Sequence, residues 1–148
     1  MQLLLGIFIK DETIIFYNKI IMLFNLMPIC PLDGYNILKC LLSLVVPLKK
    51  VLYILVIASI ITLVSIIVRY ELIKENTLII IFLIYKIIEE YKNIKYLLNK
   101  FYLERILYAF KYKVKYISSI NGMFRNNKHI INGINEHDYL IKYKYSRK

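Results

Sequence analysis

The sequence contains few of the side chains that usually build a metal or redox centre. It has two cysteines, Cys30 and Cys40, without CxxC spacing, and two histidines, His129 and His137, which lie eight residues apart. These spacings exclude a zinc finger. We expect both cysteines to be buried thiols that pack like small apolar residues, with metal binding by Cys30 as the less favoured alternative. We expect both histidines to be solvated.

Charge is scarce and balanced in the first part of the chain. Of the net charge of +11, residues 92–148 carry +10, with thirteen Lys or Arg against three acidic residues, so residues 1–91 carry +1. A hydrophobic content of 59% is high for an ordinary soluble domain. The composition predicts a remnant of a preceding loop or helix over residues 1–12, a membrane part over residues 13–91, and a basic tail over residues 92–148.

Val51–Val68 is the clearest candidate for a helix that crosses a membrane. It has 18 residues without a charge, and thirteen of them are Ile, Leu or Val. This length approaches the ~20 residues that cross the hydrocarbon core, and the side chains favour insertion by about 4 to 8 kcal/mol. A second span is predicted from about Asn76 through the run TLIIIFLIYKII, where Lys86 can extend its amine to the interface.

A third apolar run, Thr13–Leu32, is interrupted by Lys19, Pro28 and Pro31. Proline removes a backbone donor and bends a helix, and the freed carbonyls are tolerated at membrane depth only beside protein or a water-filled cavity. The interruption therefore indicates a site. We predict an all-α membrane protein with about three transmembrane segments, one of them broken by prolines, and a basic tail.

The positive-inside rule places the basic tail in the cytoplasm. With the predicted spans, the chain is expected to be a multi-pass protein of the cell membrane. Lys86–Lys100 has apolar residues at helical spacing and is predicted to extend the last helix along the membrane surface. Phe110–Tyr116 alternates as a strand does, and Asn121-Gly122 and Asn132-Gly133 are hairpin-turn dipeptides. The tail is therefore expected to contain short strands.

Basic and aromatic residues alternate in the tail, a composition that many nucleic-acid-binding proteins share. No RNP, KH or zinc-finger pattern accompanies it. Positive charge beside a membrane also fixes topology and attracts anionic lipid, by about 1 kcal/mol for each basic residue near the surface. We therefore expect membrane lipid, and no nucleic acid, as the partner of the tail.

Asp33 stands at the end of the broken apolar run, and a carboxylate in the bilayer costs about 2.5 to 3.5 kcal/mol. Water, a basic partner, a proton or a metal ion can each offset that cost, and a carboxylate is an ordinary ligand for zinc. The residue type alone leaves these alternatives open. The segment around Asp33 reads NLMPICPLDG over residues 25–34.

In this segment Asn25, Pro28, Pro31, Asp33 and Gly34 have the spacing NxxPxxPxDG. The pattern resembles the site-2 protease family of intramembrane zinc metalloproteases, most closely the bacterial branch that includes the stage IV sporulation membrane protease. The resemblance extends over residues 13 to about 91. It implies that Asp33 is a zinc ligand and that the other four residues form the substrate-side part of the site. The alternatives are a helix kink and an interfacial carboxylate.

The sequence departs from this family in the part that carries the chemistry. The resemblance implies that the two histidines and the glutamate of an HExxH motif complete the zinc site and supply the general base. No HExxH is present in the sequence. The chain alone is therefore not expected to hydrolyse peptides. An N-terminal truncation, with Met1 as an internal methionine, is the simplest explanation.

Three hypotheses for the function remain. The first is the carboxyl-terminal part of an intramembrane zinc metalloprotease, which cleaves membrane-anchored substrates and needs a missing amino-terminal half. The second is a non-catalytic multi-pass membrane partner or regulator. The third and least favoured is a small lipid-binding polypeptide whose basic tail lies on anionic lipid.

Overall fold

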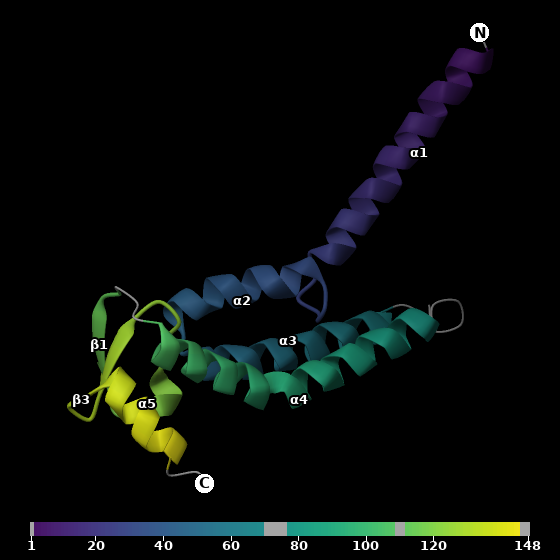
Figure 1. The fold of residues 1–148 in the computed structure, drawn as a ribbon. Coiled ribbons are helices and arrows are strands. Elements are labelled where there is room, and N and C mark those ends of the chain that lie inside the picture. The colour runs from purple at the N-terminus through teal and green to yellow at the C-terminus, as the bar shows by residue number, and fades with distance from the viewer. Residues whose placement is uncertain (1, 70–76, 109–111, 146–148) are drawn as a thin grey trace.

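The computed structural model describes residues 2–69, 77–108 and 112–145, and within these ranges it is mostly helical. Two helices flank the NLMPICPLDG segment, two long helices follow, and a small sheet with a last helix ends the chain (Figure 1). The elements are α1 (Gln2–Asn25), α2 (Asp33–Val45), α3 (Leu48–Arg69), α4 (Thr77–Leu107), β1 (Val114–Ile117), the 3-10 turn η1 (Ile120–Gly122), β2 (Lys128–Ile131), β3 (Ile134–Asn135) and α5 (Glu136–Tyr145).

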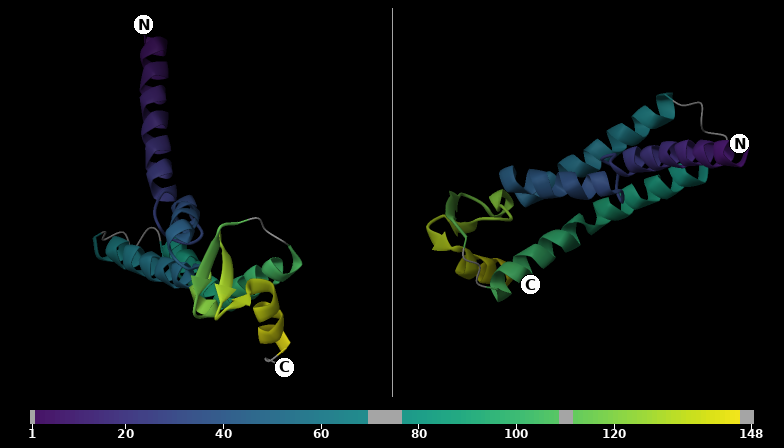
Figure 2. Two further views of the ribbon diagram at one scale, coloured as in Figure 1. Left: turned by 90° about the vertical axis from the view of Figure 1, so that its left-hand side faces the viewer. Right: turned by 90° about the horizontal axis from the view of Figure 1, so that it is seen from above.

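Helices α3 and α4 lie side by side and run in opposite directions, and they form the centre of the molecule (Figures 1 and 2). Their facing side chains build the main apolar core, with Leu52 and Val56 from α3 and Leu83 and Ile87 from α4. Helix α2 packs along α3 through a second cluster that includes Tyr35 and Leu55. The outer faces of these helices carry many exposed large apolar side chains.

Helix α1 extends away from this body (Figures 1 and 2). Its apolar side chains from position 14 onward are largely exposed, among them Ile14, Ile15, Phe16, Ile20, Ile21, Met22 and Leu23. Exposure of such a continuous apolar surface is unusual for a soluble monomer and marks an interaction surface. The helix therefore presents the kind of surface that lipid or another polypeptide covers.

The end of the chain forms a small domain of three strands and helix α5. Strand β1 pairs with β2 in parallel, and β2 pairs with β3 antiparallel. Ile131 and Leu140 are fully buried between the sheet and α5. The domain is joined to the start of α3, because the Leu48 amide donates to the Met123 carbonyl at 3.0 Å and Lys49 Nζ donates to Asn121 Oδ1 at 3.0 Å.

The prediction of about three transmembrane segments is wrong. Among residues 2–69, 77–108 and 112–145, only Leu48–Val68 forms a helix long and apolar enough to cross a membrane. The predicted third segment fails because α1 ends at Asn25 and carries Lys10, Asp11, Glu12 and Lys19 along its length. The predicted second segment fails because Lys86, Glu89, Glu90 and Lys92 follow soon after the apolar start of α4, while its expected start at Asn76 lies outside the described residues.

The three-stranded sheet confirms the short strands expected in the tail, so the chain as a whole is not all-α. The strand expected over Phe110–Tyr116 begins at Val114, and residues 110 and 111 lie outside the described part. The hairpin at Asn132-Gly133 is confirmed, with φ of 51° and 81°. A hairpin at Asn121-Gly122 is wrong: β1 and β2 are parallel, and a two-residue turn cannot connect parallel strands. The helical extension over Lys86–Lys100 is confirmed and continues to Leu107.

Gly133→Ala is expected to weaken the β2–β3 hairpin by about 1 kcal/mol, because φ of +81° is costly for a residue with a Cβ. Amide hydrogen exchange in β2 and β3 should then become about fivefold faster. Gly122→Ala is the matched control, since its Cβ would meet only Ile117 side-chain carbons at 3.8 Å. Equal effects of the two substitutions would contradict this account of the turn.

Candidate functional site

The segment Leu26–Leu32 is an irregular turn between α1 and α2. The Pro28 and Pro31 rings interrupt the helical hydrogen bonding here, and the Cys30–Pro31 peptide is cis. Short backbone bonds replace the helical ones: the Ile29 amide donates to the Met27 carbonyl at 2.8 Å, and the Leu32 amide donates to the Ile29 carbonyl at 2.7 Å. The helix interruption expected from the two prolines is therefore present.

A buried hydroxyl on α3 holds this turn. Ser59 is fully buried in the middle of α3, and its Oγ accepts a hydrogen bond from the Cys30 amide at 3.3 Å. The same oxygen lies 3.0 Å from the Pro28 carbonyl and 2.9 Å from the Leu55 carbonyl. A hydroxyl has one proton, so it donates to one of these carbonyls at a time. Ile29 is fully buried beside it and belongs to the main core.

Gly34 allows the start of α2 to lie against the turn. A Cβ at this position would lie 2.0 Å from the Leu26 carbonyl oxygen and 2.5 Å from the Met27 carbonyl oxygen. Both atoms belong to the backbone, so no side-chain movement relieves the clash. The neighbouring Asp33 is the first residue of α2, where a carboxylate interacts favourably with the helix dipole. Asp33 is exposed.

A polar contact between α2 and α4 fixes the helix that carries Asp33. The Tyr35 hydroxyl donates to Glu90 Oε1 at 2.8 Å, and Lys39 Nζ lies 3.3 Å from the same oxygen. Tyr35 is 2% exposed. The sequence alone did not indicate this contact, although Tyr35 and Lys39 stand four residues apart and therefore share one helix face. The partner on α4 has no signal in the sequence.

The structure brings the five motif residues together on one turn, with different exposure. Asn25 and Pro28 are half-buried, Pro31 and Asp33 are exposed, and Gly34 is buried. Cys30 is buried as expected, whereas Cys40 is exposed, so the prediction for Cys40 is wrong.

These residues do not form a complete zinc site. Within the described ranges, no three His, Cys, Asp or Glu side chains lie close enough to hold a metal ion. A catalytic zinc ion needs three protein ligands and an open position for water. Asp33 supplies one carboxylate, so the described residues do not fit the ion by themselves.

A second buried polar cluster lies in the tail domain. Glu136 Oε2 accepts hydrogen bonds from the His129 amide at 2.7 Å and from His129 Nδ1 at 3.2 Å. His129 Nε2 accepts from the Phe124 amide at 3.0 Å, so the ring is the neutral tautomer with its proton on Nδ1. His129 is fully buried, and the prediction of a solvated side chain is wrong for it; His137 is exposed.

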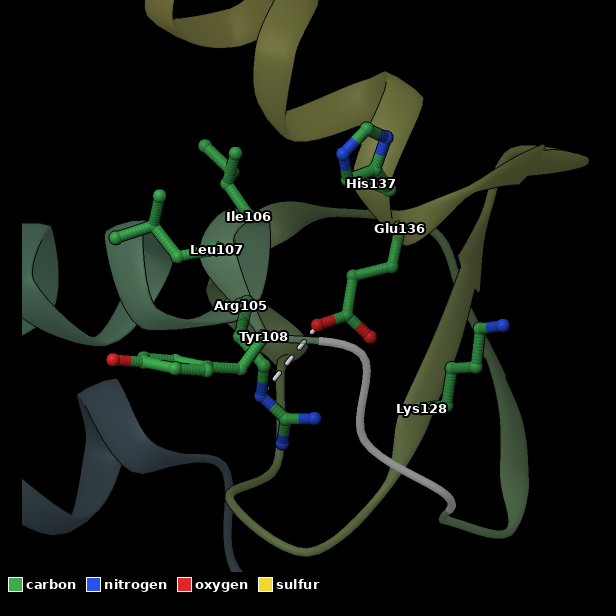
Figure 3. A pocket seen from close by; sticks show the side chains of 7 residues that line it. All are labelled: Arg105, Ile106, Leu107, Tyr108, Lys128, Glu136 and His137. Carbon is green, nitrogen blue, oxygen red and sulfur yellow. Dashed lines mark ion pairs between the residues drawn. The ribbon is translucent and has the colours of Figure 1, made fainter.

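Arg105 completes this cluster beside a small pocket of about 260 Å³ (Figure 3). Its Nε lies 3.5 Å from Glu136 Oε1, and its Nη2 donates to the Phe124 and Arg125 carbonyls. Burial lowers the pKa of Arg105, and the Glu136 carboxylate opposes that shift. Figure 3 shows both side chains between the end of α4 and the start of α5. The cluster compensates its own charges, as a structural ion pair does.

Comparisons with known proteins add no family to this description. No protein-family model matches the chain, and a search of curated proteins finds no match. The candidate site therefore rests on its residues and their geometry.

Ser59→Ala is expected to destabilise the chain by about 1 to 3 kcal/mol, because the buried Cys30 amide loses its hydrogen-bond partner. Denaturant unfolding of the full chain in detergent measures the change. The control is Ser65→Ala, which removes a hydroxyl from an exposed position on α3 that bonds only the Ile61 carbonyl four residues before it. A loss no larger than that of the control would show that the hydroxyl does not hold the turn.

Glu136→Ala is expected to destabilise the tail domain by about 3 to 5 kcal/mol, because it leaves the buried Arg105 and His129 without their common carboxylate. Hydrogen exchange of the β2 amides reports the loss. Glu104→Ala on the exposed side of α4 should stay within about 0.5 kcal/mol of the parent chain. A small effect at position 136 would mean that the cluster is dispensable.

Proposed function

We propose that this chain is the aspartate-bearing part of an intramembrane zinc metalloprotease of the site-2 type. The observation that carries the proposal is the placement of Asp33. Its carboxylate is exposed at the start of α2. The preceding Leu26–Leu32 turn is held by the Cys30–Ser59 hydrogen bond and by the close approach of Gly34. A rigid frame that presents an accessible carboxylate is what a ligand for a shared metal ion requires.

The apolar surface supports a membrane location. Leu48–Val68 of α3 is long and apolar enough to cross a bilayer, and the exposed faces of α1 and α4 are rich in Ile, Leu, Phe and Tyr. Burying such a surface in lipid or against a second polypeptide is favourable by about 25 cal/mol for each Å² removed from water. On this proposal α3 lies in the cell membrane and the basic tail lies on its cytoplasmic side.

The missing ligands define what the chain cannot do alone. Within the described residues, Asp33 does not belong to a group of three His, Cys, Asp or Glu side chains that could hold a metal ion. The sequence also has no HExxH. The zinc ligands and the general base must come from another segment or polypeptide, which would dock on the exposed apolar side of α1. The chain alone is then a binding half and not a hydrolase.

A non-catalytic membrane partner is the second candidate, favoured by the same absence of a metal-binding group. In this case Gly34 and the prolines serve only to form the turn, and Asp33 has no ligand to hold. The two functions differ in what replacement of Asp33 does once the complementary segment is supplied.

The chain purified alone in detergent is expected to hold no stoichiometric zinc by metal analysis, since one carboxylate is too few ligands. The DNA upstream of the coding sequence, translated in all frames, is expected to encode an HExxH segment. When that segment is co-expressed, a membrane-anchored reporter should be cleaved, and Asp33→Asn should lower the rate by about 100-fold or more.

Asp138→Asn is the control for this experiment, because it removes an exposed carboxylate of the tail helix α5. Full cleavage by the Asp33→Asn variant would overturn the protease proposal. Upstream frames without HExxH would leave a separate polypeptide as the source of the missing ligands. Zinc bound in a 1:1 ratio by the chain alone would contradict the incomplete ligand set.

A further inference from the structure

An open groove of about 630 Å³ lies between α4 and α5. Its walls include Tyr102 and Ile106 from α4 and Leu140 and Tyr143 from α5, and the Tyr102 and Tyr143 rings meet edge to face at 6.5 Å. Two lysines, Lys100 from α4 and Lys144 from α5, also line it. The groove therefore combines an apolar floor with positive charge contributed from both helices.

The position of the groove along the molecule follows from the pairing of α3 and α4. The Tyr53 and Tyr91 rings lie 6.5 Å apart, and the two helices run antiparallel. Leu48 lies five residues before Tyr53 on α3, and Tyr96 lies five residues after Tyr91 on α4. Each step is about 7.5 Å in the same direction, so Tyr96 is level with Leu48. The apolar stretch Leu48–Val68 ends at that level. The groove begins at Tyr96 and follows α4 for about 15 Å beyond it.

Lys100 and Lys144 are free to bind an anion. Both are exposed, and neither forms an ion pair with a residue that the structure describes. The surrounding tail carries a net charge of +10, which raises the local concentration of anions. A small soluble anion would leave the Tyr and Leu walls of the groove unused. A ligand with an anionic head and an apolar chain satisfies both parts.

We infer that this groove binds one anionic phospholipid of the adjacent leaflet. The phosphate lies between Lys100 and Lys144, and one acyl chain passes Tyr143 and Tyr96 and so leads back toward the bilayer. The inference rests on the proposed location of α3 in the bilayer, because only then does the groove begin at the level of the lipid headgroups. It does not depend on any proteolytic activity of the chain.

The sequence contains no tryptophan, so one introduced indole reports on a single position. The full chain carrying Tyr143→Trp is reconstituted in phosphatidylcholine nanodiscs that contain a minor fraction of phosphatidylglycerol with a brominated acyl chain. Bromine quenches an indole on contact. Brominated phosphatidylglycerol is expected to quench this indole at least about fivefold more effectively than brominated phosphatidylcholine at the same fraction, because each lysine near an anionic lipid contributes about a fivefold preference.

Lys100→Gln with Lys144→Gln should abolish that preference. Lys92→Gln with Lys95→Gln is the matched control, because it removes the same charge from exposed positions of α4 outside the groove and should change the preference less than twofold. Equal loss in both double variants, or equal quenching by the two lipids, would overturn the inference.

A chain with Ile57→Trp tests separately whether α3 lies in the bilayer, because Ile57 is on the exposed face of α3. Quenching at position 57 without quenching at position 143 would overturn the lipid site and leave α3 in the bilayer. Absence of quenching at both positions would overturn the membrane location as well.

Discussion

The hydrogen bonds of the Ser59 hydroxyl hold together the part of the molecule that carries the candidate site. The α1–α2 turn contains two prolines and a buried isoleucine, and its backbone cannot continue a helix. Its Cys30 amide and Pro28 carbonyl both bond the one Ser59 hydroxyl of α3. Without that oxygen a buried donor would stay unpaired, which costs more than an ordinary hydrogen bond contributes.

The remaining polar contacts extend this constraint along the chain. Glu90 of α4 accepts a hydrogen bond from the Tyr35 hydroxyl and forms an ion pair with Lys39, both on α2. Rotation of the helix that begins with Asp33 would break this half-buried ion pair. At the other end of α3, the Leu48 amide is bound by the Met123 carbonyl of the tail domain. The turn, the central helices and the tail domain are therefore connected by specific contacts as well as by apolar packing. This connection also keeps the lysine-lined groove at a fixed level relative to α3.

Local signals in the sequence predicted the features that depend on local physics. Val51–Val68 lies within the most apolar helix, the prolines interrupt a helix, and Asn132-Gly133 forms a hairpin because its residues accept positive φ. The failures concern distant partners. His129 is buried because Glu136 and Arg105 meet it across the tail domain, and no pattern around His129 indicates this.

The number of spans failed for a different reason. The predicted spans rest on apolar runs, whereas a spanning helix also includes the charged residues on either side of such a run. Helix α1 stops at Asn25 and includes the charged stretch Lys10–Glu12, and α4 continues through Glu89 and Glu90. These charges are visible in the sequence, so the number of spans fails on how much charge one spanning helix accommodates and not on a contact between distant residues.

The motif itself separates into residues that the fold explains and residues that it does not. Gly34 is required by the two backbone oxygens that face it, and Pro28 and the neighbouring Ile29 are required by the turn on Ser59. Asp33 is exposed, and its side chain makes no hydrogen bond or ion pair with a described residue; its interaction with the dipole of α2 is the contribution to the fold that the structure gives it. Packing therefore accounts for the glycine and not for the choice of an acidic side chain at position 33. On the proposed function this carboxylate is the member of the motif that binds the metal ion, so Asp33 is the residue on which fold and function can be told apart.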